Sequence, residues 1–133
     1  MSNDPQTIAE VKEFFEEFVE AYPKDDIDRY LALWAKDSNL VVYGTGEKWV
    51  GYEEEYKYAP AKEKERFDEI SLSFDWTKIN SHGSIAWIAA DVTVNLRIGE
   101  QRIVSPARLT GVVKKSEGKW AIIQGHISIA PPQ

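Results

Sequence analysis

Apolar residues recur at every second position through the C-terminal part of the chain, a spacing typical of strands with one buried face. Residues 107–114 and 119–129 predict two such strands, joined by a tight turn at residues 116–118. One face of the predicted pair carries only apolar side chains and glycine: Ala107, Leu109, Gly111, Val113, Ala121, Ile123, Gly125, Ile127 and Ile129. Because an all-apolar face needs cover, we expect helices to pack on it.

The N-terminal part of the chain has the spacing of helices instead. Asp4 followed by Pro5 is a typical helix start, and apolar residues then recur three and four positions apart as far as Tyr22. Pro23 is expected to end this helix, and a second, short helix is expected within residues 25–34.

A third helix is predicted from Tyr52 to Ala59, where Pro60 is expected to stop it. The charged segment 61–66 that follows is interpreted as a mobile, solvated connection. Further strands are predicted at residues 40–43, 48–50, 70–77 and 87–96. This order of helices and strands predicts one α+β domain over residues 1–133, with a curved antiparallel sheet wrapped around the N-terminal helices. The concave face is expected to carry Ile88, Ala90, Val92, Leu109, Gly111, Ile123 and Ile127.

Composition narrows the classes of function. The formal net charge of −6 argues against a nucleic-acid partner or an anionic membrane surface, and no basic stripe offsets it. The chain has no cysteine, which excludes disulfides and thiol chemistry and fits a reducing compartment. The polar N-terminus is unlike a signal peptide, so we expect a cytoplasmic protein. We expect no cofactor and no metal, since no His and carboxylate spacing supports a metal site.

Three stretches carry a resemblance to a known family. They are the segments 32–46 and 49–54 and, above all, residues 108–128, where Arg-x-Thr, Gly-Lys-Trp and His-x-Ser follow one another. The sequence resembles the SnoaL-like branch of the nuclear transport factor 2-like (NTF2-like) superfamily, which also contains ketosteroid isomerases and the association domain of calmodulin-dependent kinase II. The resemblance implies a cone-shaped NTF2-like fold, a fold that serves enzymes, binding proteins and assembly modules alike.

The resemblance does not carry ketosteroid isomerase chemistry across. It places the proton-shuttling carboxylate of those enzymes at Val42 or Tyr43, and their oxyanion-binding acid on the strand of Arg108, Thr110 and Gly111. None of these is a carboxylic acid, so both groups needed for enolisation are missing. We therefore do not expect classical ketosteroid isomerase activity.

The resemblance also implies the character of the pocket. The pocket arginines of the kinase association domain correspond to Val92, Gly111 and Ile127, and its pocket histidine falls near Glu55. Such a pocket suits a neutral or cationic hydrophobic molecule. Glu55, if buried, is the candidate proton-transfer residue. The expected ligand pocket consists of Trp34, Tyr43, Trp49, Glu55, Tyr58, Ala90, Val92, Gly111, Gly125 and Ile127.

The opposite face of the sheet is expected to form a homodimer. It is predicted to carry apolar surface at Trp87, Val112, Trp120 and Ile122, more than a sheet face usually leaves in water. The expected interface residues are Trp87, Asp91, Arg108, Thr110, Trp120, Gln124 and His126. A cluster of Asp91, Arg108 and His126 also fits an acid–base site, and an interface network is the favoured interpretation.

Three functions remain open from the sequence. The leading hypothesis is a homodimer that binds a small, largely hydrophobic molecule, with no reaction assigned. The second is an enzyme of the isomerase, cyclase or dehydratase kind that uses Glu55, Tyr43 or Asp91. The third is an association module without ligand chemistry.

Overall fold

The computed structural model describes residues 3–130 and contains three helices and one six-stranded sheet within that range. The strands lie in the order β2-β1-β6-β5-β4-β3, and the sheet curves without closing. Only the β1–β6 pair is parallel; the other neighbours are antiparallel, as expected. The elements are α1 (Pro5–Ala21), α2 (Ile27–Leu31), β1 (Val41–Tyr43), β2 (Lys48–Val50), α3 (Tyr52–Arg66), β3 (Glu69–His82), β4 (Ile85–Ile98), β5 (Gln101–Ser116) and β6 (Lys119–Ile129).

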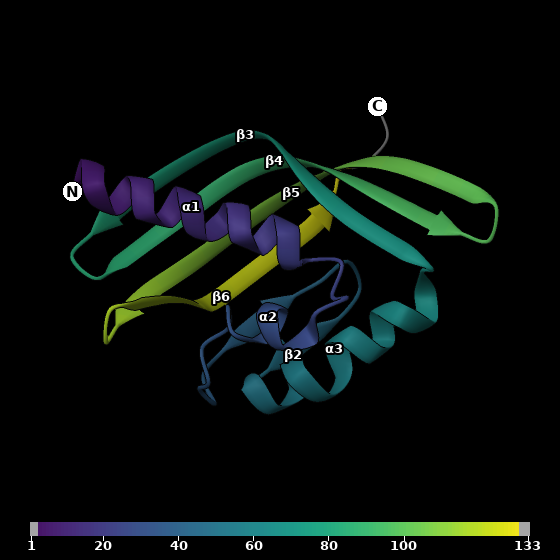
Figure 1. The fold of residues 1–133 in the computed structure, drawn as a ribbon, viewed down its shortest axis with the longest axis horizontal. Coiled ribbons are helices and arrows are strands. Elements are labelled where there is room, and N and C mark those ends of the chain that lie inside the picture. Colours follow the sequence, from purple (N-terminus) through teal and green to yellow (C-terminus); the bar gives the residue numbers. More distant parts are fainter. Residues whose placement is uncertain (1–2, 131–133) are drawn as a thin grey trace.

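Helix α1 begins and ends as its sequence predicts. The Asp4 side chain accepts a hydrogen bond from the Thr7 backbone N–H, and Pro5 occupies the first helical position. The apolar stripe faces the sheet, with Val11, Phe15, Phe18 and Ala21 buried. Figure 1 shows α1 lying across the long strands, while α2 and α3 lie together beyond β6.

The concave face predicted for β4 and β5 is confirmed. Ile88, Ala90, Val92 and Leu109 are each 6% exposed or less, and Gly111 is buried. Arg108 and Thr110, the alternate residues of β5, are exposed, as are Gln124 and His126 of β6. Period-two parity therefore holds over the centre of the sheet.

The prediction for the first half of β6 is wrong by one residue. A register shift places Val112 opposite Gln124 but Val113 opposite Ile122, so Ile123 is an extra residue in the strand. Such a bulge reverses the parity of the residues before it. Ile122 is consequently 3% exposed in the core, where Ile123 was expected.

Trp120 changes face with Ile122. Its Nε1 donates a hydrogen bond of 3.0 Å to Glu10 of α1, so the indole packs on the helix-covered side of the sheet. Its expected place on the outward face was therefore wrong, and the bulge at Ile123 is the physical reason.

The predicted end of the third helix is also wrong. Helix α3 continues through Pro60 as far as Arg66, so residues 61–66 are helical rather than a mobile connection. Proline within a helix removes one backbone hydrogen bond, and here the Pro60 ring is buried. Charged side chains at both ends stabilise α3 by complementing the helix dipole. They are three glutamates in the first turn, and Lys64 and Arg66 in the last turn.

Within residues 3–130 no helix is long and apolar enough to cross a membrane.

Candidate functional site

A cavity of about 340 Å³ lies between the C-terminal end of α1, helices α2 and α3, and the sheet. Its volume is at the lower end of the range of small-molecule pockets, about 300–1,000 Å³. Its wall is mostly aromatic and aliphatic. The principal side chains are Phe15, Phe18, Tyr22, Tyr30, Trp34, Val42, Trp49, Glu55, Ala59, Glu63, Phe67, Ile70, Val94, Leu96, Leu109, Ile122 and Ile127.

Seven of the ten predicted pocket residues border this cavity: Trp34, Tyr43, Trp49, Glu55, Gly111, Gly125 and Ile127. Ala90 and Val92 do not; both are buried in the core away from the cavity. Tyr58 does not either, since it is 54% exposed and stacks on the outer side of Trp49 with ring centroids 6.0 Å apart. Tyr43 is 47% exposed and lies against His126, with ring centroids 5.5 Å apart.

Two facing glycines help to leave this space open. Gly111 of β5 and Gly125 of β6 are directly paired and both buried, so neither strand places a side chain there. The Trp34 ring covers Gly125, where an added Cβ would lie 3.6 Å from it. The aromatic ring thus replaces a strand side chain as the local floor of the cavity.

Glu55 is the most buried ionisable group of the cavity. It lies in the first turn of α3, is 0% exposed, and accepts a 3.0 Å hydrogen bond at Oε1 from the Tyr30 hydroxyl. Burial raises the pKa of Glu55 to about 7, while the Tyr30 hydrogen bond and the Lys24 charge oppose that rise. The carboxyl group can therefore give or accept a proton near neutral pH.

A buried ion pair lies beside Glu55. Lys24, in the turn between α1 and α2, is 4% exposed and its Nζ pairs with Glu63 Oε2. The ammonium group also lies over two aromatic rings, 4.2 Å from the centroid of Tyr22 and 4.8 Å from that of Tyr30. Burial lowers the pKa of Lys24, and the Glu63 carboxylate opposes that shift.

Sequence patterns alone did not predict Tyr30, Lys24 or Glu63 as site residues. Lys24 resembles a solvated loop lysine, and its burial depends on a backbone φ of 61°, which is unusual for a residue other than glycine. Glu63 was assigned to a solvated connection. The available signal was the spacing of Glu55, Ala59 and Glu63, which puts all three on one face of a helix that continues past Pro60.

Three buried polar atoms of the cavity wall have no hydrogen-bond partner among the described residues: Trp34 Nε1, Glu55 Oε2 and Glu63 Oε1. Buried polar groups in proteins are nearly always paired, and each unpaired group costs about 1–3 kcal/mol. Three residues of the cavity wall thus carry one unpaired donor and two unpaired acceptors.

The outward face of the sheet holds the predicted interface residues other than Trp120. Strand pairing places Asp91 beside Arg108 and Thr110 beside His126, all exposed, with Gln124 one row away. Thr110 and His126 also border the cavity. Trp87 is half-buried on the same face. Residues 3–130 hold no group of three or more His, Asp or Glu side chains able to bind a metal ion.

Comparison with known proteins agrees with this geometry. An NTF2-like protein of unknown function from Pseudomonas putida KT2440 is similar over 99% of this chain and 92% of its own, with 16% identity and a TM-score of 0.82. A structure from Streptomyces avermitilis, described as a candidate dehydratase of the NTF2-like family, is similar over 97% of this chain and 100% of its own, with 16% identity and a TM-score of 0.83.

A third structure, an NTF2-like superfamily protein from Salmonella enterica serovar Typhimurium, is similar over 98% of this chain and 94% of its own, at 17% identity and a TM-score of 0.82. Among curated proteins no match was found. At these identities the three structures establish the fold alone. The fold is that of NTF2-like proteins. The model of the SnoaL-like domain family matches residues 11–132, and the chain therefore belongs to that family.

Proposed function

We propose that this chain binds a small, largely apolar molecule in the cavity, with the polar part of the molecule at Glu55, Glu63 and Trp34. One observation carries the proposal: the three buried polar atoms without a partner all belong to residues that line the same cavity. A ligand that donates to two carboxylate oxygens and accepts from the indole N–H would satisfy all three.

The rest of the cavity wall supports an apolar body for this molecule. Phe18, Tyr30 and Trp34 form a continuous aromatic wall, with neighbouring ring centroids 6.2 Å and 5.9 Å apart. Aromatic and aliphatic walls with few convergent polar groups are typical of small-molecule sites. An aromatic or alicyclic ring of the ligand would bury the most surface against these rings.

The variant Ala59→Leu tests the cavity directly. Ala59 lines the cavity from α3 between Glu55 and Glu63, so a leucine there is expected to fill part of the space. Leucine and alanine have similar helix propensities, so α3 should persist. With 2-phenoxyethanol as probe, we expect the Kd measured by calorimetry to rise by about tenfold or more, and the free energy of unfolding to stay the same or increase.

The matched control is Ala61→Leu, the same substitution at an exposed position of α3. It should leave probe binding unchanged. Equal binding by Ala59→Leu and the parent chain would show that the probe does not enter this cavity. If the parent chain bound none of 2-phenoxyethanol, 2-phenoxyethylamine and phenoxyacetate, the proposal would be overturned for this probe class.

We further propose a homodimer formed through the outward sheet face. Trp76, which is 54% exposed, Trp87 and Val112 supply apolar surface there, although Trp120 and Ile122 do not contribute. Polar contacts are expected from Asp91, Arg108, Thr110, Gln124 and His126. Sedimentation equilibrium at micromolar concentration should give twice the chain mass of 15.2 kDa. A monomer at that concentration contradicts this assembly.

A further inference from the structure

The charges around Glu55 and Glu63 do not balance. Both carboxyl groups belong to residues of the cavity wall, and Lys24 is the cation that acts on both of them. The other cations of the wall, Lys62 and Arg66, pair with Glu65 and Glu47 instead. When both carboxyl groups are ionised, one negative charge is left without a partner. A buried charge is costly unless it is paired, so the site must take up either a proton or a second cation.

The chain already contains one example of how this region holds an ammonium group. Lys24 Nζ is held by one oxygen of Glu63 and by the faces of the Tyr22 and Tyr30 rings. The other oxygen of Glu63 and one oxygen of Glu55 are unpartnered in the same cluster. Aromatic faces and carboxylates together are the groups that proteins use to bind organic ammonium ions.

We infer that the cavity binds a primary amine carried on an apolar body, its ammonium group donating to the free oxygens of Glu55 and Glu63. This inference rests on the proposed function and names the class of molecule that the cavity takes. An ammonium group has three donors, enough for both carboxylate oxygens. Its positive charge neutralises the carboxylate charge that Lys24 does not.

Trp34 adds a requirement on the body of the amine. Its Nε1 is a donor, so an ammonium group cannot satisfy it. An ether or hydroxyl oxygen on the apolar body would accept from it, and an aromatic ring would do so more weakly. The class is therefore an arylalkyl or similar amine with one oxygen acceptor.

Binding of such an amine is coupled to ionisation of Glu55. The groups that act on this carboxyl group are the Tyr30 hydroxyl from α2, Lys24 from the turn after α1, and Glu63 from α3. Since the pKa of Glu55 is about 7, roughly one-tenth of it is ionised at pH 6 and nine-tenths at pH 8. The affinity for an amine that stays protonated should therefore rise about tenfold between these pH values.

Three probes that each carry a two-carbon chain on a phenoxy oxygen test the inference: 2-phenoxyethylamine, the neutral 2-phenoxyethanol, and phenoxyacetate. At pH 8 we expect calorimetry to give a Kd for the amine at least about tenfold below that of the alcohol, and weaker binding still for phenoxyacetate. At pH 6 the advantage of the amine should shrink by about tenfold. Equal Kd values for amine and alcohol at pH 8 would overturn the inference while leaving the proposed function intact.

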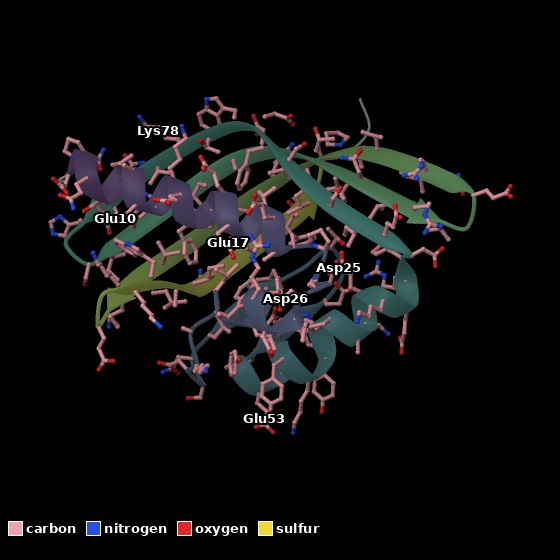
Figure 2. The ribbon with its side chains drawn as sticks, viewed as in Figure 1. Glu10, Glu17, Asp25, Asp26, Glu53 and Lys78 are labelled. Atoms are coloured by element: carbon pink, nitrogen blue, oxygen red, sulfur yellow. The ribbon has the colours of Figure 1, made fainter. Side chains whose placement is uncertain are left out.

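Variants assign the effect to the carboxyl groups. Glu55→Gln is expected to remove the pH dependence and most of the preference for the amine over the alcohol. Glu53→Gln is the matched control, because Glu53 lies on the same helix with its side chain 72% exposed and directed away from the protein body (Figure 2). Histidines generally titrate in the same pH range, so His126→Gln must keep the pH dependence; its loss in that variant would contradict the role of Glu55.

Discussion

Replacing Lys24 with methionine is expected to lower the free energy of unfolding by about 3–5 kcal/mol, the usual cost of removing one partner of a buried ion pair. Methionine keeps the length and the apolar part of the side chain, and neither residue is glycine, so the unusual backbone at this position is equally demanding for both. The loss arises because Glu63, whose side chain is 18% exposed, is left without its cationic partner.

Urea denaturation at pH 7 measures this effect, and two further variants make it specific. Lys57→Met breaks an ion pair on the surface of α3, where the Lys57 side chain is 44% exposed, and should cost no more than about 0.5 kcal/mol. The double variant Lys24→Met with Glu63→Gln removes both charges and should recover most of the loss. A double variant as unstable as Lys24→Met alone would assign the effect to packing rather than to charge.

The stability of the parent chain is expected to depend on pH through Glu55. The unfolded chain releases the Glu55 proton near the ordinary pKa of 4.5, whereas the folded chain holds it up to about pH 7. The folded state therefore binds more protons between these values. Its stabilisation by this group is complete below about pH 4.5 and is lost as the pH rises through about 7. The two pKa values correspond to a loss of roughly 3 kcal/mol.

The variant Glu55→Gln isolates this contribution from the other titrating groups. The free energy of unfolding of the parent minus that of Glu55→Gln should fall by roughly 3 kcal/mol between pH 4.5 and pH 8, measured by urea denaturation at several pH values. The control Glu65→Gln, at a side chain that is 71% exposed on the same helix, should show no comparable change. A difference that is flat with pH would mean that Glu55 ionises in the folded chain as it does in water.

The same experiment bears on the hypothesis of catalysis. A general acid or base is most effective when its pKa lies near the working pH. Glu55 meets this condition through burial, and Tyr30 holds one of its oxygens. If the pH dependence were absent, burial would not tune Glu55 for proton transfer near neutral pH, and the hypothesis of catalysis would rest on Tyr43 or Asp91.

Local patterns in the sequence were enough to predict much of the fold. The cap at Asp4 and Pro5 and the helical stripe after it defined α1, because these signals act within a few residues. The alternation along β4 and β5 predicted the buried face, because side chains in a regular strand alternate strictly. The motifs in residues 108–128 indicated the family, which the match over residues 11–132 confirms.

Features that depend on contacts between distant residues were decided by the tertiary structure. The bulge at Ile123 turns Ile122 into the core and Trp120 toward Glu10 on α1, 110 residues away. Nothing in the alternation of β6 marks this extra residue, because both faces there carry apolar side chains. Packing also favours the continuation of α3 through the buried Pro60, although a proline usually ends or kinks a helix.

The candidate site, too, was only partly predictable from the sequence. The resemblance directed attention to Glu55, but the residues that set its chemistry, Tyr30, Lys24 and Glu63, come from three separate segments. Lysine and glutamate in charged stretches are mostly solvated, and only the fold shows that these two are paired out of water. The sequence determined which helices and strands form. The packing of α2, α3 and the turn at Lys24 decided the polarity of the cavity, because burial and not residue type sets the cost of an unpaired charge.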